Sequence, residues 1–254
     1  MNKISVVIAS YNAQAFIEKA IKSVLDQSLT PHEIIIIDGG SKDDTVRIIK
    51  KYESKLAYWV SERDKGIYDA WNKGVEKVTG DWILFLGCDD ILLNDTIEKY
   101  TDFIKSIPSD TEFISSRNQI VDENGAPIRV EGWEWEWPRF LNVMTVAHPG
   151  SLHSVELFKK YGNYNTNYKI CGDYEFLLRP QQNLKAQYLN EISIVVAEGG
   201  ASDSVAAVKE AYNASIITGG HSKAKAITNY GKIYILHLLK KRLRRVGLNL
   251  YLRK

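Results

Sequence analysis

Polar and acidic side chains follow three apolar runs of the chain, where they could bind a polar ligand. A Ser-Tyr-Asn triplet at 10–12 follows the first run, Asp38 ends the second, and an Asp-Asp pair at 89–90 follows the third. Apolar, β-branched runs of this kind are typical of strands buried on both faces of a parallel sheet. Ligands of open α/β sheets sit beyond the carboxyl ends of the strands, so these clusters are expected to meet in one crevice.

Two other segments place polar groups at predicted helix starts. In residues 64–74, Gly66 stands at a helix start, where free backbone N–H groups favour anions and a glycine permits close approach. In residues 171–175 (Cys-Gly-Asp-Tyr-Glu), Asp173 opens another helix, a position that also suits an N-cap. The alternative for Asp38 is a structural role instead of a binding role, because Asp-Gly-Gly is a turn signal.

The elements that must position these groups follow from apolar spacing. The pattern predicts strands over 4–9, 33–38, 58–61 and 81–87, with helices over 13–27, 43–53 and 66–78 between them. This alternation predicts an α/β fold with a doubly wound, mostly parallel sheet and helices on both faces. Later segments predict helices over 95–106, 154–161, 172–180, 205–217 and 227–245, and strands over 112–121, 127–131 and 186–196. We expect one body in three parts, 1–95, 96–204 and 205–254, without a flexible linker.

Composition is that of a globular protein with a sizeable core, since 44% of the 254 residues are apolar. Two cysteines are too few for a disulfide framework or a zinc site, which favours a reducing compartment. No secretory leader is evident, and no apolar run approaches the ~20 residues that span a bilayer.

Charge is distributed unevenly along the chain. The first 210 residues carry 23 basic and 31 acidic side chains, whereas residues 211–254 carry ten Lys and Arg and no Asp or Glu. An acidic body with a basic tail indicates an anionic partner for the tail. Nucleic acid is not expected, because no recognition motif accompanies the basic residues.

Taken together, the motifs resemble those of family-2 glycosyltransferases of the GT-A fold, and are most similar to bacterial enzymes of O-antigen, capsule and exopolysaccharide assembly. The resemblance rests on Ser-Tyr-Asn at 10–12, Asp-Gly-Gly-Ser-Lys-Asp-Asp-Thr at 38–45, residues 64–74 and Asp-Asp at 89–90. It covers residues 3–95 strongly and 145–180 moderately. Four motifs in this order, each after a predicted strand or at a helix start, are specific where one alone is not.

The resemblance implies a nucleotide-sugar site in the first part of the chain. A carboxylate at position 38 can accept a hydrogen bond from N3–H of uracil, so a UDP-sugar is the expected donor. Tyr11 resembles the family residue that packs near the base, with a core aromatic as the alternative. The full set of residues expected at the donor is Ser10, Tyr11, Asp38, Asp64, Lys65, Gly66, Tyr68, Asn72 and Cys88.

A metal site is also implied, because Asp89 and Asp90 stand where the family carries its D-x-D motif. Carboxylate oxygens suit a hard divalent cation, Mn²⁺ or Mg²⁺, which would offset the charge of the leaving diphosphate. The first aspartate of that motif is Gly87 here, so Asp89 is the expected ligand and Asp90 its support.

The resemblance further implies a general base at Asp173. Residues 171–179 resemble the family's Glu-Asp-x-Glu-Leu-x-x-Arg helix, with Gly172 in place of the first glutamate. An acceptor hydroxyl must lose its proton as it attacks the anomeric carbon. One carboxylate opposite the leaving group implies direct displacement with inversion.

Acceptor contacts are expected from His148 and from Trp133, Trp135 and Trp137, which alternate with glutamates. Alternation of period two predicts a strand with the aromatics on one face, which could stack on sugar rings. The alternatives are a structural histidine and a tryptophan face packed into the core.

The tail combines an apolar run at 233–239 with a basic run at 240–245. A basic amphipathic helix of this kind predicts attachment to an anionic membrane surface through 232–254, although a helix docked on the domain is the alternative. The expected location is therefore the cytoplasm, peripheral on the inner face of the cell membrane.

The reading that unites these features is a metal-dependent inverting hexosyltransferase, which moves a sugar from a UDP-sugar to a glycan or polyprenyl-diphosphate-linked acceptor in bacterial surface polysaccharide synthesis. One alternative is a sugar-1-phosphate nucleotidyltransferase, although that class opens with a Gly-rich, basic loop where this chain has Ser-Tyr-Asn. Another is a non-catalytic glycan-binding protein, which retention of Asp89 and Asp173 disfavours.

Overall fold

The computed structural model describes residues 2–245, and the first half of the chain forms a parallel sheet. Its strands are β1 (Ile4–Ser10), β2 (Glu33–Asp38), β3 (Tyr58–Ser61) and β4 (Trp82–Gly87), in the spatial order β3-β2-β1-β4. All three pairings are parallel, as predicted. The connecting helices are α1 (Ile17–Leu25), α2 (Thr45–Lys51) and α3 (Ile67–Val75), with a short 3₁₀ turn at Glu53–Lys55.

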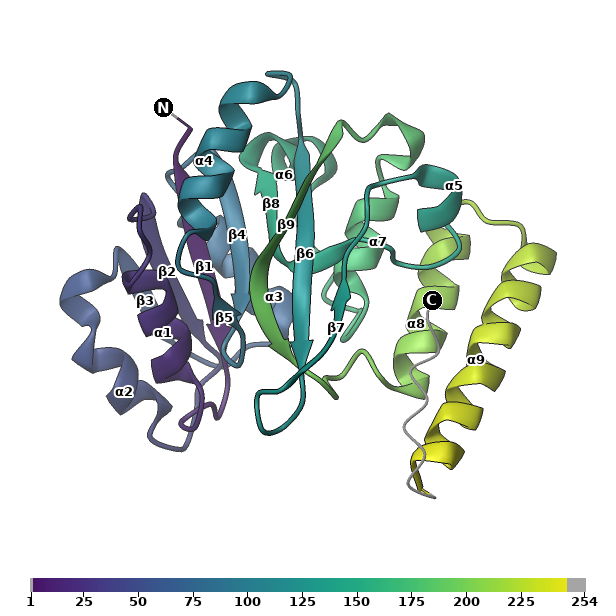
Figure 1. The fold of residues 1–254 in the computed structure, drawn as a ribbon, viewed down its shortest axis with the longest axis horizontal. Helices are drawn as coiled ribbons and strands as arrows, with labels where there is room; N and C mark the ends of the chain where they lie inside the picture. Colours follow the sequence, from purple (N-terminus) through teal and green to yellow (C-terminus); the bar gives the residue numbers. More distant parts are fainter. Residues whose placement is uncertain (1, 246–254) are drawn as a thin grey trace.

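The second half extends the same sheet to the full order β3-β2-β1-β4-β8-β6-β9-β5, with β7 paired to β6 (Figure 1). β6 and β9 are parallel, whereas β4–β8, β6–β8, β6–β7 and β5–β9 are antiparallel, so the sheet is mixed in this half. The strands are β5 (Ile91–Leu92), β6 (Phe113–Val121), β7 (Pro127–Glu131), β8 (Ala147–Ser154) and β9 (Ala186–Ala197). The helices are α4 (Thr96–Ser106), α5 (Trp137–Phe140), α6 (Val155–Tyr161), α7 (Gly172–Leu178), α8 (Val205–Ile217) and α9 (Lys223–Arg245), with a 3₁₀ turn at Gln181–Asn183.

Two apolar cores lie on opposite faces of the sheet, because successive strand residues point to opposite sides. Val6 and Ile8 of β1 pack in a cluster with α1, α2 and α4, whereas Val7 and Ala9 pack in a cluster with α3, α6 and α7. The predicted α/β architecture with helices on both faces is therefore confirmed.

Strand register places the predicted site at one edge of the sheet. Ser10 at the end of β1 lies beside Asp38 of β2, and Asp38 lies beside Ser61 of β3. On the other side, Ala9 of β1 lies beside Gly87 at the end of β4. The loops that follow these four strands therefore emerge side by side, as expected of a parallel sheet.

Two segments differ from the sequence-based prediction. β8 was not predicted, because the His-Pro-Gly run at 148–150 reads as a turn; Gly150 has φ 78°, which a glycine accommodates within the strand. The predicted strand around Trp133–Trp137 is wrong: residues 132–136 are in no strand, and α5 begins at Trp137 with a proline at its first turn. The alternation there reflects exposed glutamates and half-buried tryptophans in an unpaired segment.

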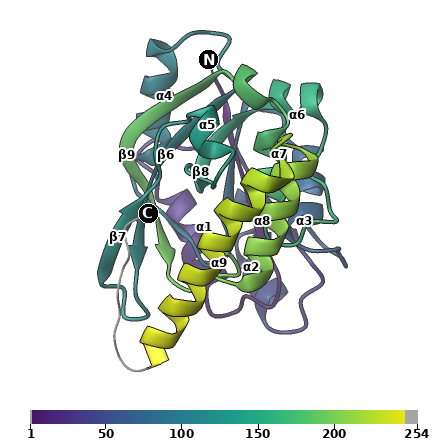
Figure 2. The ribbon, with the colours of Figure 1, turned by 90° about the vertical axis from the view of Figure 1, so that its right-hand side faces the viewer.

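At the end of the molecule opposite β3 and α2, the helices α8 and α9 lie side by side (Figures 1 and 2). Among the described residues, no helix has both the length and the apolar character needed to cross a bilayer. The predicted membrane-binding segment, 232–254, is described only as far as Arg245, and its last residues lie outside the described chain.

Candidate active site

Asp38 is the hydrogen-bonding centre of the loops that follow β1, β2 and β3. Its side chain is fully buried and accepts five hydrogen bonds within the protein. The donors are the hydroxyls of Ser10 (3.1 Å), Ser41 (2.5 Å) and Ser61 (2.6 Å) and the backbone N–H groups of Gly40 (3.1 Å) and Ser41 (2.9 Å). The arrangement makes Asp38 a turn cap that fixes the loops, and contact with a uracil base stays a prediction.

Tyr11, by contrast, is open to solvent at this edge, with 61% of its surface exposed. Asn12 beside it is locked to the next loop, since its backbone N–H donates to Ser41 Oγ and its Oδ1 accepts from Lys42 N. Cys88 is half-buried nearby, and burial together with the charge of Asp89 raises the pKa of its thiol to about 11. Cys88 therefore stays protonated at neutral pH and offers a soft apolar surface beside the crevice.

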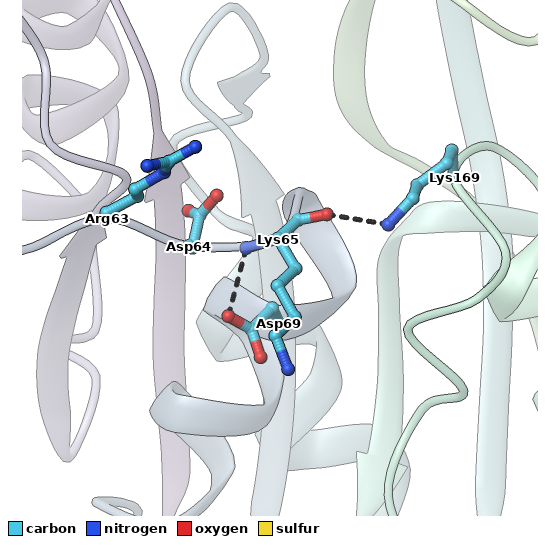
Figure 3. A pocket seen from close by; sticks show the side chains of 5 residues that line it. All are labelled: Arg63, Asp64, Lys65, Asp69 and Lys169. Carbon is cyan, nitrogen blue, oxygen red and sulfur yellow. Dashed lines mark hydrogen bonds between the residues drawn. The ribbon is translucent and has the colours of Figure 1, made fainter.

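The segment that follows β3 lines an open cavity of about 500 Å³ with Lys169, a residue of the second half (Figure 3). Its other lining residues are Arg63, Asp64, Lys65 and Asp69. Asp64 packs against Gly39, where an added Cβ would lie 2.5 Å from its carboxylate, and it accepts from Gly66 N. Gly66 has φ 122°, so a glycine is required at this helix start. Three cationic and two anionic side chains favour an anionic ligand.

α3 connects this cavity to the predicted base. The hydroxyl of Tyr68 has one hydrogen, which it shares between Ile170 O at 2.6 Å and Asp173 Oδ1 at 3.0 Å. Burial and the charge of Asp173 raise the pKa of Tyr68 well above its usual value, so the phenol remains a donor. Gly172 makes room for this ring, because a Cβ there would lie 2.8 Å from Tyr68.

Asn72 of α3 has a structural role. Its Nδ2 donates to Tyr164 O and its Oδ1 accepts from Tyr164 N, each at 2.9 Å. Both polar atoms of the amide thus hold the segment that precedes α7 onto α3. This pairing does not support the predicted contact of Asn72 with a nucleotide.

Asp89 and Asp90 form a carboxylate pair beyond β4, with Asp89 exposed and Asp90 buried. Burial and the charge of Asp89 raise the pKa of Asp90 to about 7. A Cβ at Gly87 would lie 2.7 Å from Asp90 Oδ2 and 3.0 Å from Asp89 Oδ1, so the space of a side chain at 87 is taken by these carboxylates. Within residues 2–245 no cluster of three or more His, Cys, Asp or Glu side chains could hold a metal. Carboxylate oxygens are the ligand type that a hard divalent cation prefers, so the chemistry of this pair is compatible with such a cation.

His148 is a core residue and 2% exposed, which does not support the predicted acceptor contact. Its ring stacks on Trp71 at 4.9 Å between centroids, and its Nε2 lies 3.1 Å from the hydroxyl of Tyr164. Burial lowers the pKa of both His148 and His153, so both rings are neutral near pH 7, although the charge of Asp173 opposes this for His148.

The three tryptophans lie in different environments. Trp135 and Trp137 pack against the core that contains Phe140, with 4.2 Å between the ring centroids of Trp135 and Phe140. Trp133 is half-buried, and the guanidinium of Arg139 lies 5.7 Å from its ring. Core packing therefore describes Trp135 and Trp137, and an acceptor contact by Trp133 stays a prediction.

Sequence reasoning missed two residues that the fold brings to this region. Lys169 donates from Nζ to Lys65 O at 2.8 Å and so joins the two halves of the chain over the cavity. Glu210 of α8 accepts hydrogen bonds from the turn that leads into α7. The only sequence signals were the proximity of Lys169 to the 171–175 motif and the place of Glu210 as the last acidic residue of the chain.

Comparison with known sequences gives a consistent result. The profile of glycosyl transferase family 2 matches residues 5–153. A PGL/p-HBAD biosynthesis glycosyltransferase of Mycobacterium bovis is 29% identical over 211 residues, which cover 79% of each chain. A second glycosyltransferase, from Mycobacterium tuberculosis, is 32% identical over 182 residues, or 69% of this chain and 68% of its own length. Chondroitin synthase of Escherichia coli is 27% identical over 74% of this chain and 28% of its own.

Comparison with solved structures supports the fold. TarS 1–349 of S. aureus in complex with UDP-GlcNAc superposes with a TM-score of 0.67 at 17% identity, over 91% of this chain and 71% of that one. Another TarS structure is covered over only 41% of its length, so the chain spans less than half of that protein. A mannosyltransferase of Pyrobaculum calidifontis in complex with GDP-Man and Mn²⁺ gives a TM-score of 0.61 at 16% identity, over 89% of this chain and 64% of that one. The predicted GT-A fold is confirmed by this likeness.

Proposed function

The chain belongs to glycosyl transferase family 2, and on that premise we propose that it transfers a sugar from a UDP-sugar to a glycan acceptor with inversion at the anomeric carbon. The observation that carries the proposal is the junction of two separate segments. The donor-side helix α3 and the predicted base Asp173 are joined through Tyr68, at the edge of the sheet where the loops after β1, β2 and β4 emerge.

A UDP-sugar is the proposed donor because the crevice combines an exposed aromatic ring with a cationic cavity. The ring of Tyr11 offers a face on which the nucleobase can stack. Positive charge for the diphosphate comes from Arg63, Lys65 and Lys169. Asp38 holds in place the loops that the nucleobase would contact. Two of the TarS structures that superpose on this chain contain UDP or UDP-GlcNAc.

Asp173 is the proposed general base. In the transfer step, an acceptor hydroxyl loses its proton to Asp173 as its oxygen bonds to the anomeric carbon, and the bond to the nucleoside diphosphate breaks on the opposite face. Oδ1 of Asp173 accepts from Tyr68 and from Tyr174 N at 2.8 Å, which fixes the carboxylate. One oxygen is thereby oriented by the protein, and Oδ2 is the atom proposed to accept the proton of the acceptor hydroxyl.

Asp89 and Asp90 are the proposed holders of a divalent cation, Mn²⁺ or Mg²⁺. Such a cation would supply charge compensation for the leaving diphosphate when bound. Asp89 is the exposed member of the pair and the proposed direct ligand, while Asp90 is buried and accepts from Gly87 N at 3.2 Å. A bound cation would favour the ionised form of Asp90.

The proposed acceptor is a glycan on a lipid carrier, used in bacterial surface polysaccharide synthesis on the cytoplasmic face of the cell membrane. Support comes from α9, which exposes a run of large apolar side chains among basic residues. The exposed apolar residues are Tyr234, Ile235, Leu236, Leu238 and Leu239. A helix of this composition suits an anionic membrane surface, where such an acceptor would lie.

A donor panel tests the proposal directly. Purified protein is incubated with UDP-, GDP- and dTDP-sugars, a divalent cation and polyprenyl-diphosphate-linked glycans, and nucleotide release and product are measured. The expected result is release of UDP coupled to extension of the glycan. Formation of a nucleotide-sugar from a sugar phosphate, or glycan binding without turnover of any donor, would contradict the proposal.

A further inference from the structure

Glu210 on α8 binds the turn that leads into α7 with both of its carboxylate oxygens. Its Oε2 accepts from Ile170 N at 2.8 Å and from Cys171 N at 2.9 Å, and both oxygens accept from Lys169 N at 3.0 and 3.1 Å. Hydrogen bonds to an ionised acceptor are roughly twice as strong as neutral ones. Three consecutive backbone N–H groups are thus fixed by one side chain from a helix about 40 residues further along the chain.

The same turn is held from its other side by Tyr68. Ile170 donates its N–H to Glu210 and accepts from the Tyr68 hydroxyl through its carbonyl oxygen. Tyr68 in turn lies within 3.0 Å of Asp173 Oδ1. Glu210, Ile170, Tyr68 and Asp173 therefore form one connected hydrogen-bonded chain that ends on the proposed base.

α7 is tied to the C-terminal helices at further points. Thr218, just after α8, donates from Oγ1 to Glu175 Oε1 at 2.9 Å, and the hydroxyls of Tyr174 and Tyr230 lie 3.1 Å apart. These contacts keep α7 packed on α8 and α9 independently of Glu210. Loss of Glu210 alone should thus loosen the turn at 169–171, which keeps its contacts with Tyr68 and Lys65, and leave the helices in place.

We propose that Glu210 is a positioning residue of the transfer reaction, which sets the orientation of Asp173 by fixing residues 169–171. This inference rests on the proposed function, because it gives Asp173 the role of base. It adds α8 to the machinery, a helix outside the stretch matched by the family profile. Glu210 itself does not contact the reacting atoms.

The test compares Glu210→Ala and Glu210→Gln with the unmodified full chain. Alanine removes all acceptors, whereas glutamine keeps one neutral oxygen. We expect kcat for sugar transfer to fall about tenfold in the glutamine variant and about a hundredfold in the alanine variant, as expected of lost hydrogen bonds to a charged group. The KM for the donor should change less than kcat, because among residues 169–171 only Lys169 lines the cavity, and its Nζ stays bonded to Lys65 O at 2.8 Å.

Two further measurements separate positioning from general destabilisation. Hydrogen exchange should accelerate at the amides of residues 169–171, while the melting temperature of the glutamine variant stays near that of the unmodified protein. The matched control is Glu156→Gln, the same change at an exposed Glu156–Lys159 pair on α6, which should alter neither kcat nor this exchange.

Each outcome decides the inference. Unchanged kcat in both variants, or equal losses in kcat, donor affinity and global stability, would overturn it. If the alanine variant does not fold, the glutamine variant decides alone. Asp173→Asn distinguishes the two proposals: if it abolishes transfer while both Glu210 variants keep full activity, the inference fails and the proposed function stands. If the unmodified protein turns over no nucleotide-sugar, the proposed function fails first.

Discussion

The hydroxyl of Tyr68 lies 3.0 Å from Oδ1 of Asp173, although 105 residues separate the two in sequence. Tyr68 belongs to the first turn of α3, which borders the cationic cavity, and Asp173 belongs to the first turn of α7. The contact therefore joins the first half of the chain to the second, as the Lys169–Lys65 contact also does. It would give the proposed base a fixed orientation before any substrate arrives.

Tyr68→Phe removes this hydrogen bond and keeps the packing of the ring. We expect kcat to fall about tenfold, the scale of one hydrogen bond to a charged group, with nucleotide affinity unchanged. Steady-state kinetics together with calorimetric titration of UDP would measure both. Full activity would show that Asp173 needs no orientation from α3.

Asp173→Asn keeps the shape of the side chain and removes its basicity. Transfer should fall by about 10²–10⁴, the usual contribution of general acid–base catalysis, with little change in donor binding. The anomeric configuration of the product from the unmodified enzyme, determined by NMR, should be inverted. A retained configuration, or near-normal transfer by the variant, would place the base elsewhere.

Asp89→Asn tests the metal site, because an amide is a weaker ligand for a hard cation than a carboxylate. Turnover should decrease by roughly 10² or more, the scale of a lost electrostatic element. Excess chelator should abolish the activity of the unmodified enzyme, and Mn²⁺ or Mg²⁺ should restore it. Activity that is indifferent to chelation would exclude a required cation.

The raised pKa of Asp90 predicts that the stability of the metal-free protein depends on pH. Its pKa is raised to about 7 in the fold, whereas the unfolded chain releases this proton near pH 4. The folded state therefore binds more protons between these values, so this group lowers stability as pH rises from about 4 to 7. The side chain in Asp90→Asn cannot ionise. The melting temperature of this variant should therefore rise relative to that of the unmodified protein as the pH increases across this window.

Thermal melts in chelator at half-unit pH steps would measure that difference. Groups that do not interact with Asp90, including the buried histidines, titrate equally in both proteins, so the difference reports on Asp90 and its immediate neighbours. A difference in melting temperature that does not vary with pH would contradict the expectation.

The exposed apolar residues of α9 predict binding to anionic vesicles. Ile235, 58% exposed, and Leu239 can be replaced by serine without loss of a core side chain. The double variant, and truncation after Gly231, should reduce sedimentation with phosphatidylserine vesicles and leave donor hydrolysis largely intact. Binding should weaken with salt, because each basic group near the surface contributes about 1 kcal/mol. Equal sedimentation with neutral vesicles, or of the truncated protein, would reject the attachment.

Much of the fold could be predicted because the first four strands are uninterrupted apolar runs. Ile34–Ile37 and Trp82–Leu86 are buried, and short apolar, β-branched runs of this kind are typical of strands covered on both faces. β8 escaped prediction because Pro149 and Gly150 are local turn signals, and its place in the sheet depends on pairing with β4 and β6. The tryptophan segment shows the converse, since its alternation is strand-like but no partner strand pairs with residues 132–136.

The site was predictable where a residue's position along a strand or helix determined its location. Asp38 ends β2, Asp89 follows β4 and Asp173 lies in the first turn of α7, so periodicity located these residues, while their roles stay predictions. The pairing of Asn72 with Tyr164 and of Glu210 with residues 169–171 depends on contacts between segments far apart in sequence. No local pattern encodes these contacts, and the same side chains would be read as ordinary polar surface groups.

The close approach of Gly172 to Tyr68 restricts how this lineage can change by mutation. A Cβ at 172 would lie 2.8 Å from the tyrosine ring, so no larger residue fits there while the ring keeps this position. A side chain at 172 therefore requires a smaller residue or a displaced ring at 68, and either change would remove the hydrogen bond to Asp173. The two positions are thus expected to covary.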